Sequence, residues 1–365
     1  AVGLPDTSHA IQYKARLLHQ LNGLSSSEAV GASAGMQVGR GEGYITGAHY
    51  HALLWNGRSN DFIDLHPDGL TTSNARAISG SAQVGGGSGG TIGNQTHALL
   101  WYGTADSVVD LHPVGFDNSV ALGVFENIQV GQVANNGVPF PVDNHAAMWN
   151  GTADSFVDLH PVGFSRSAAF GASADSQVGE GDSIANRSLR ALLWRGTAES
   201  YIDLHPSGFR LSSAAAVWQD LQVGWGFHTA TSSARALMWN GSAESVIDMH
   251  PVGASGSRIE GISQFGQVGS ATIIGDNNEY LGSHALLWQG SAESVLDLHP
   301  LLEELPISML QSFAYGIDDY GNIVGYGHDE EANRYAILWT LVPEPSSALL
   351  LACGIATVFA CRRRL

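Results

Sequence analysis

The stretch His97-Ala98-Leu99-Leu100-Trp101, followed by Asp110-Leu111-His112-Pro113, decides the fold, because close copies of it recur along most of the chain. Its tryptophan returns at intervals of 45 to 51 residues. The seven positions are Trp55, Trp101, Trp149, Trp194, Trp239, Trp288 and Trp339. So regular a period predicts a repeat architecture, and not the two or three separate domains that a length of 365 residues would suggest.

Two further motifs mark the same repeating unit. Upstream of six of the tryptophans lies a Gln-Val-Gly, which begins at Gln37, Gln83, Gln129, Gln177, Gln222 and Gln267, and the seventh unit has Ile323-Val324-Gly325 instead. Downstream comes Asp-Leu-His-Pro, which begins at Asp64, Asp110, Asp158, Asp203 and Asp297, with Asp-Met-His-Pro at Asp248 as a variant. A unit of about 40–50 residues has the length of one propeller blade.

Each unit predicts four short antiparallel strands. The first alternates small and bulkier residues, as in 121–123, which suits a strand near a crowded axis. Gln-Val-Gly forms the second strand. The third, 51–55, is apolar on both faces, as a strand between neighbouring sheets must be. The fourth is of the 108–112 type, and Asn150-Gly151 and Asn240-Gly241 predict two-residue hairpin turns between strands three and four.

The two ends of the repeat region predict a closed ring. The unit of Trp339 has no Asp-Leu-His-Pro after it, whereas Leu17-Leu18-His19-Gln20 near the N-terminus reads as a fourth strand without a unit. In a closed ring this strand completes the last blade, whereas an open solenoid would need caps. We therefore predict an all-β, seven-bladed β-propeller over residues 1–341, with a β-solenoid as the alternative.

Composition and charge are those of an acidic all-β protein. The chain has 16 basic and 34 acidic residues, a formal net charge of −18, and 45 glycines. Such a surface repels nucleic acid and anionic lipid, and its natural counter-ions are divalent metals or basic partners. Both cysteines, Cys353 and Cys361, lie in the C-terminal tail, so the body has no disulfide or thiolate metal site. The first residue is Ala1, which is compatible with removal of an export signal.

Residues 342–365 form a separate tail. Val342-Pro343-Glu344-Pro345 interrupts the repeat pattern, because closely spaced prolines end a strand. The uncharged segment 346–361 follows, and Arg362, Arg363 and Arg364 come directly after it. Its 16 residues would span about 24 Å as a helix, slightly less than a ~30 Å hydrocarbon core. The arginines favour the cytoplasmic side, so we expect a short transmembrane helix that leaves the repeat body outside.

Both parts of the chain resemble known families. The repeat resembles the bacterial extracellular HAF repeats, with His-Ala-Leu at His51, His97 and His284, and His-Ala-Ala at His145. Arg190, Arg235 and Tyr335 replace this histidine elsewhere, and Asp-Leu-His stands where the family has Asp-Leu-Gly. The tail is similar to the PEP-CTERM sorting signal in the order of its Val-Pro-Glu-Pro, apolar helix and arginine cluster. This resemblance implies recognition by an exosortase of a Gram-negative bacterium, transient inner-membrane anchoring, and delivery to the cell surface or exopolysaccharide matrix.

The recurring polar residues predict structural roles. The carboxylate and imidazole of Asp64 and His66 lie on one face of a strand and could bind a metal or relay protons. The pair recurs in six units, however, and catalysis needs one asymmetric arrangement. We interpret it as a hydrogen bond that joins blades or fixes a loop. Residues 318–322 resemble a fragment of a calcium loop without its downstream glutamate, which indicates a turn. We predict no catalytic residue, metal site or cofactor, and Ca²⁺ is the only candidate ion.

The loops between strands two and three are the most variable part of the unit. They should emerge on one face of a propeller, together with the connections between blades, and they are rich in aromatic residues. Unpaired aromatic residues among Gly, Ser and Asn are typical of surfaces that bind carbohydrate or protein. The candidate binding residues are Tyr44, Tyr50, Phe140, Trp225, Phe227, His228, Tyr280 and Tyr326.

These observations favour a non-enzymatic, exported protein of the cell surface or biofilm matrix that binds glycan or a surface protein through its loop face. One alternative is a secreted propeller hydrolase or lyase acting on polysaccharide. It needs acids outside the repeat pattern that converge at the channel, for which the candidates are Glu126, Glu260, Asp276 and Glu279. The other alternative is a structural subunit whose acidic surface is bridged by divalent cations.

Overall fold

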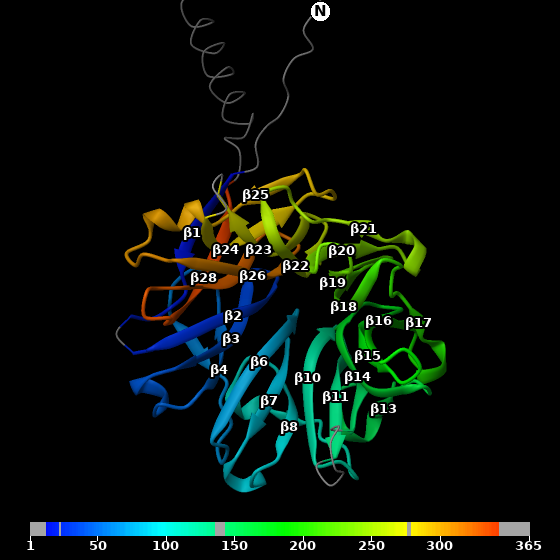
Figure 1. Ribbon diagram of the computed structural model, residues 1–365. Helices are drawn as coiled ribbons and strands as arrows, with labels where there is room; N and C mark the ends of the chain where they lie inside the picture. The colour runs from blue at the N-terminus through cyan, green and yellow to red at the C-terminus, as the bar shows by residue number, and fades with distance from the viewer. Residues whose placement is uncertain (1–11, 22, 136–142, 276–278, 343–365) are drawn as a thin grey trace, which may run out of the picture.

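Seven four-stranded antiparallel sheets surround a central axis (Figure 1). The computed structural model describes residues 12–21, 23–135, 143–275 and 279–342. The predicted seven-bladed propeller is confirmed, and so is the order of the four strands in each blade. The candidate Phe140, Asp276 and the tail from Pro343 onward lie outside the described residues.

The blades follow one another along the chain. Blades 1 to 3 consist of β2 (Ser26–Ser33), β3 (Met36–Glu42), β4 (His51–Trp55) and β5 (Phe62–Asp64); β6 (Thr72–Ser79), β7 (Ala82–Ser88), β8 (Thr96–Trp101) and β9 (Val109–Asp110); and β10 (Asn118–Phe125), β11 (Ile128–Asn135), β12 (Asp143–Trp149) and β13 (Val157–Asp158). Blades 4 and 5 consist of β14 (Phe164–Ala172), β15 (Gln177–Ser183), β16 (Ser188–Trp194) and β17 (Ile202–Asp203), and of β18 (Phe209–Trp218), β19 (Leu221–His228), β20 (Ser233–Trp239) and β21 (Ile247–Asp248). Blade 6 consists of β22 (Ala254–Ser263), β23 (Gly266–Ile274), β24 (Tyr280–Trp288) and β25 (Val295–Asp297).

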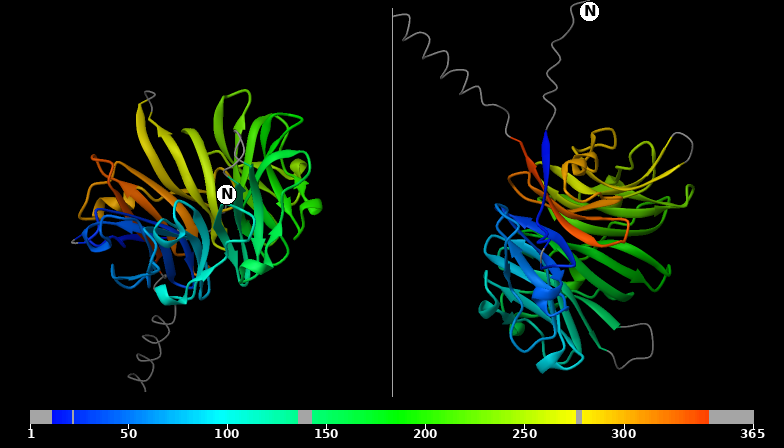
Figure 2. Two further views of the ribbon diagram at one scale, coloured as in Figure 1. Left: turned by 90° about the horizontal axis from the view of Figure 1, so that it is seen from below. Right: turned by 90° about the vertical axis from the view of Figure 1, so that its left-hand side faces the viewer.

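Blade 7 is built from both ends of the described chain. Its strands are β26 (Gln311–Ile317), β27 (Ile323–His328), β28 (Arg334–Leu341) and the N-terminal β1 (Tyr13–Leu17), which pairs antiparallel with β28 (Figure 2). The backbone N–H of Leu18 then donates to the carbonyl of Ala336. In every other blade, the leucine or methionine of the fourth-strand motif donates in the same way to an alanine carbonyl of the third strand. The predicted closure is confirmed, although the strand lies mainly before the predicted residues 17–20.

The tryptophans form the core between blades. All seven are at most 1% exposed, because the third strand has a neighbouring sheet on each of its faces. One apolar cluster, for example, joins Leu54 and Val38 of blade 1 to Trp101 and Ala75 of blade 2. Burial of one such ring contributes about 4 kcal/mol, so the contacts between blades hold the ring together.

The predicted turns at Asn150-Gly151 and Asn240-Gly241 are wrong in length. The connection in blade 3 spans residues 150–156 and includes the 3₁₀ helix η4 (Ala153–Ser155). The N–H of Gly151 donates to Oε1 of Gln129 at 2.7 Å, which gives the Gln of Gln-Val-Gly its role. Equivalent 3₁₀ helices are η3 (Ala105–Ser107), η5 (Ala198–Ser200) and η6 (Ala243–Ser245), and further ones are η1 (Tyr44–Thr46), η2 (Gly90–Ile92) and η7 (Pro300–Glu304).

A β-bulge in every first strand shapes the axis. In blade 3 the register between β10 and β11 shifts between Ala121 and Gly123, and the equivalent shift occurs in the other six blades. The Gln-Val-Gly glycine permits the close approach of the two strands, because a Cβ on Gly131 would lie 1.9 Å from the carbonyl oxygen of Val120. The bulge thereby leaves one first-strand residue in each blade without a partner residue on the second strand.

Candidate functional site

The Asp-Leu-His-Pro motif forms a polar link between blades. In blade 1, Oδ1 of Asp64 accepts from the backbone N–H of His66 at 2.9 Å, and Oδ2 lies 2.7 Å from Nδ1 of His51. Nδ1 of His66 lies 2.8 Å from Oγ of Ser73, which begins the next blade and also accepts from the N–H of Ala52 at 3.0 Å. The structural interpretation of this motif is therefore confirmed.

The third-strand position is likewise a polar packing position. In blade 4, where arginine replaces the histidine, Nε of Arg190 donates to Oδ2 of Asp203 at 2.6 Å. Arg190 thus contacts the same aspartate position that His51 contacts in blade 1. His51 and His66 stack with ring centroids 3.8 Å apart. Burial, with the nearby His51 as a further cause, lowers the pKa of His66, so this ring stays neutral at neutral pH.

The loop region at residues 318–322 is a turn, as predicted. Oδ1 of Asp318 accepts from the backbone N–H groups of Tyr320 and Asn322 at 2.9 and 2.8 Å. Its Oδ2 accepts from the N–H of Gly35 in blade 1 at 2.9 Å. Across the described residues no group of three His, Cys, Asp or Glu side chains is arranged to hold a metal ion.

Only some of the predicted binding residues lie in loops. The loop face itself is confirmed, because the N–H of Ile184 in a strand two–three loop donates to the carbonyl of Gly163 in a blade connection at 3.0 Å. Tyr44 lies there in η1 and is 94% exposed, whereas Tyr280 is the first residue of β24 and is 59% exposed. Tyr50, immediately before β4, lies under the guanidinium of Arg40 at 4.5 Å.

The other candidates lie on strands, which corrects the prediction. Trp225, Phe227 and His228 belong to β19, because its ladder with β20 continues to the pair His228 and Ser233. Tyr326 belongs to β27 and is 9% exposed. The sequence pattern stopped at Gln-Val-Gly, but the second strand extends well beyond it.

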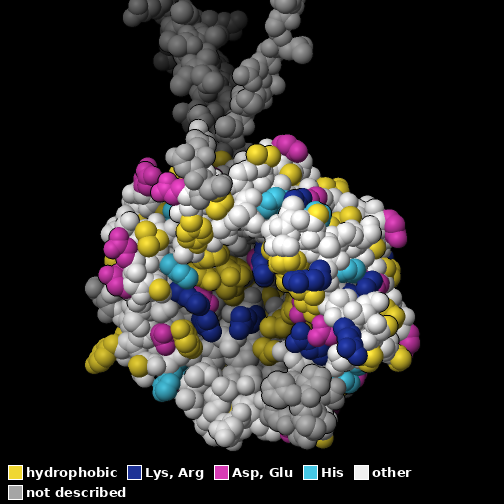
Figure 3. Space-filling view, in the orientation of Figure 1, with side chains coloured by type: hydrophobic (Ala, Val, Ile, Leu, Met, Phe, Trp, Pro, Cys, Tyr) yellow, Lys and Arg dark blue, Asp and Glu magenta, His cyan; other side chains and the backbone are white. Residues whose placement is uncertain are grey.

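The residues freed by the bulges line one axial cavity. There is one from each blade, and they differ in chemistry: Val30, Arg76, Leu122, Phe170, Ala215, Glu260 and Tyr315. Glu180, Ser213, Trp225 and Arg258 line the same cavity, which measures about 420 Å³. Sites for small molecules commonly have this size. Figure 3 shows the middle of the ring hollowed, with arginines gathered around the hollow.

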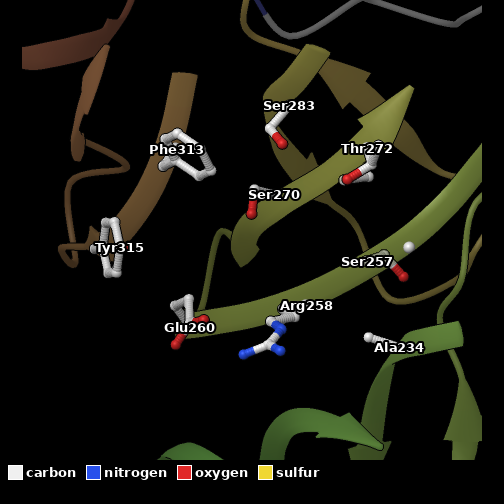
Figure 4. Close-up of a pocket in the computed structure, with 11 residues that line it drawn as sticks. Ala234, Ser257, Arg258, Glu260, Ser270, Thr272, Ser283, Phe313 and Tyr315 are labelled. Atoms are coloured by element: carbon white, nitrogen blue, oxygen red, sulfur yellow. The ribbon is translucent and has the colours of Figure 1, made fainter. Parts of the chain in front are cut away.

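Two side grooves continue the cavity between blades. One, of about 410 Å³, is lined by residues that include Arg258, Glu260 and Tyr315 (Figure 4). The other, of about 210 Å³, shares Phe170 and Glu180 with the cavity. We call the cavity and both grooves the axial funnel.

The basic groups of the funnel are of two kinds. Arg166, in the smaller groove, is paired with the carboxylate of Asp182. Arg258 instead lies over the ring of Trp225, with Cζ 4.0 Å from the centroid, and Nε of Arg76 donates to Oδ1 of Asn74 at 3.1 Å. Within the described part of the chain, neither Arg76 nor Arg258 forms an ion pair.

The acidic groups of the funnel have raised pKa values. Burial raises the pKa of Glu260 to about 7, against the opposing charge of Arg258. The side chain is half-buried, since the cavity leaves part of it accessible while protein surrounds the rest. Burial also raises the pKa of Glu180.

Two tyrosines lie beside these acids. The hydroxyl oxygens of Tyr315 and Tyr326 lie 3.3 Å apart, and the centroids of their stacked rings are 5.5 Å apart.

Of the four acids singled out in the sequence, the three that lie in the described residues are not brought together. Glu260 lies in the funnel, whereas Glu126 lies in the turn between β10 and β11, at the face opposite the loops. Glu279 lies on the loop face before β24. The acid that shares the funnel with Glu260 is Glu180, which the sequence analysis missed. It follows a Gln-Val-Gly directly, and comparison of this variable position across the repeats could have found it.

Comparison with known proteins shows the fold alone. No protein-family model and no curated protein matches the sequence. Among solved structures, a puromycin hydrolase S511A mutant complexed with PGG matches with TM-score 0.55 and 9% identity, over 86% of this chain and 51% of that one. A puromycin-hydrolyzing peptidase of Mycobacterium tuberculosis matches with TM-score 0.54 and 9% identity over the same shares. The chain thus spans about half the length of these proteins.

A further match is the β-propeller domain of the Trilobed protease from Pyrococcus furiosus, with TM-score 0.45 and 10% identity, over 75% of this chain and 98% of that one. In the described residues, no helix has both the length and the apolar character that crossing a membrane requires.

Proposed function

We propose that this chain is an exported, non-enzymatic propeller of the bacterial cell surface or biofilm matrix, and that it binds an exopolysaccharide glycan in its axial funnel. One observation carries the proposal. Seven equivalent positions, one in the first strand of each blade, differ in chemistry and face the same funnel, whereas the repeated residues hold the ring together. We therefore propose that the binding site lies at the axis and not in the loops, where the sequence predicted it.

The lining of the funnel suits a sugar chain. Sugars present both apolar C–H faces and many hydroxyl groups, so their sites combine aromatic rings with placed polar groups. Figure 4 shows Phe313 and Tyr315 on one wall of the groove, facing Ser270 across it. The hydroxyls of Thr272 and Ser283 lie on the same side as that of Ser270. Since fold does not decide function, the proposal rests on this lining.

The location rests on the sequence. The likeness of the body to HAF repeats and of residues 342–365 to a PEP-CTERM signal supports export, with an exosortase-type sorting enzyme as partner. Transient anchoring in the inner membrane would precede release to the surface or matrix. A glycan ligand agrees with that destination, because an exopolysaccharide matrix is where the resemblance places the mature protein.

Glycan binding can be tested with the full-length protein on a glycan array and against exopolysaccharide from the producing cells. We expect Trp225→Ala to weaken binding about tenfold, because truncation of a large aromatic anchor has this order of effect. Tyr44→Ala is the matched control, since Tyr44 is an exposed aromatic residue of the loop face. Loss of binding in Tyr44→Ala alone would place the site on the loops, and absence of glycan binding by the wild type would refute the proposal.

One observation favours a second candidate, a polysaccharide hydrolase or lyase. Glu180 and Glu260 line the same funnel, and two carboxyl groups with raised pKa values could serve as general acid and base. In that case the wild type would release new reducing ends or unsaturated products from the polysaccharide. Glu260→Gln would abolish this release while it retained binding. A wild type that binds without any turnover supports the non-enzymatic function.

A further inference from the structure

The arginines of the funnel are unexpected in so acidic a chain. The formal net charge is −18, yet Arg76, Arg166 and Arg258 all line the funnel. Arg166 is neutralised by Asp182. Arg76 and Arg258 have no such partner among the described residues, so their charge is available to something that enters the funnel.

Arg258 is prepared for a contact. The Cζ atom of its guanidinium lies 4.0 Å from the ring centroid of Trp225, and Figure 4 shows the side chain directed away from β22, beside Glu260. A guanidinium held against an aromatic ring keeps its N–H donors available for a carboxylate or a similar oxyanion.

The surroundings are compatible with an incoming anion. Glu260 and Glu180 are the carboxyl groups closest to this space among the cavity-lining residues, and burial raises the pKa of each. Because the pKa of Glu260 is about 7, this carboxyl is partly protonated at neutral pH and repels an anion less than an ordinary surface carboxylate does. Ser270, Thr272 and Ser283 supply hydroxyls along the adjoining wall of the groove.

We propose that the funnel binds an anionic saccharide, whose acid group contacts Arg258 with Arg76 as a second positive charge, while its sugar hydroxyls face the serine and threonine wall. The inference rests on the proposed glycan binding and specifies the class of glycan. The acid group has the chemistry of a uronate carboxylate or a sugar sulfate.

The test compares matched ligands and matched variants by isothermal titration with the full-length protein. The ligands are oligogalacturonate, the same oligosaccharide with its carboxylates reduced to alcohols, and a sulfated form of the reduced product. We expect oligogalacturonate or the sulfated form to bind, and the reduced form to bind at least about tenfold more weakly. Arg258→Gln should lower affinity for the anionic ligand about tenfold, and affinity should fall with added salt.

Arg210→Gln is the control variant. Arg210 also stacks on an aromatic residue of β19, Phe227, with Cζ 4.4 Å from the ring centroid, but it does not line the cavity. It should bind like the wild type. Equal binding of the reduced and anionic ligands, or wild-type affinity in Arg258→Gln, would overturn the inference while the proposed glycan binding stands. If no glycan binds, neutral or anionic, the proposed function itself fails.

Discussion

At the scale of single residues, the side chains divide by whether they recur. Recurring ones, such as the tryptophans and the histidines of Asp-Leu-His-Pro, are buried or hydrogen-bonded between blades. In the first strands, those that differ from blade to blade, such as Arg76, Glu260 and Tyr315, face the axis. A single position can therefore be assigned to the scaffold or to the site by comparing the seven repeats with one another.

Glu260 should make binding of an anionic glycan depend on pH. Its pKa of about 7 results from burial, and the groups that face it are Arg258 on its own strand, Tyr315 from β26, and Arg76 and Glu180 across the cavity. Above pH 7 its carboxylate is ionised and repels the ligand, so affinity should be about fivefold lower at pH 8 than at pH 6. Titration calorimetry at both values measures this difference.

In Glu260→Gln the difference between pH 6 and pH 8 should disappear, because the amide does not ionise. Glu279→Gln is the matched control, since Glu279 is an exposed carboxylate of the loop face, and it should keep the wild-type dependence. If Glu260→Gln keeps that dependence too, another group controls it.

At the scale of elements, neighbouring blades are joined by one serine at the start of each first strand. Oγ of Ser73 is buried and bonds both Nδ1 of His66 and the N–H of Ala52. Ser73→Ala leaves both partners unpaired and should lower the free energy of unfolding by about 2 kcal/mol. Urea denaturation followed by tryptophan fluorescence measures it.

Ser25→Ala is the control for this substitution, because the exposed Ser25 hydroxyl makes a single 3.1 Å bond to the carbonyl of Glu42. We expect a change within about 0.5 kcal/mol. Similar losses in the two variants would mean that the link through Ser73 contributes little to the contact between blades.

Much of the element scale could be predicted from the sequence. Alternation of small residues placed the first strands at the axis, and the apolar run before each tryptophan placed the third strands between sheets. The length of β19 and the 3₁₀ turn after Trp149 could not be predicted, because both depend on hydrogen bonds between segments distant in sequence, such as Gly151 to Gln129. The bulges could not be predicted for the same reason, so the funnel that their residues line could not be predicted either.

At the scale of the whole molecule, closure depends on the N-terminal strand. Deletion of residues 1–20 removes β1 and the buried Leu18, and it exposes the edge of β28 beside Trp339. We expect a loss of about 5 kcal/mol and a melting temperature lower by roughly 10 °C, measured by calorimetry.

Deletion of residues 1–11 serves as the control, since it leaves β1 complete. It should melt within about 2 °C of the full chain. A propeller that tolerates both deletions equally would show that the seventh blade is stable with three strands.

The bulge in each first strand also has a consequence for how this protein can evolve. Within each tripeptide the outer residues, which are Ala or Gly except for Ile259 in blade 6, maintain the ring, while the middle residue lies at the axis and does not pair in the ladder. Mutations at the seven middle positions can therefore accumulate without harm to folding, so a lineage can change what it binds faster than it changes its shape. Chains descended from a common ancestor would keep the same ring and diverge first at these seven sites, and a library randomised there would yield folded proteins with new ligands.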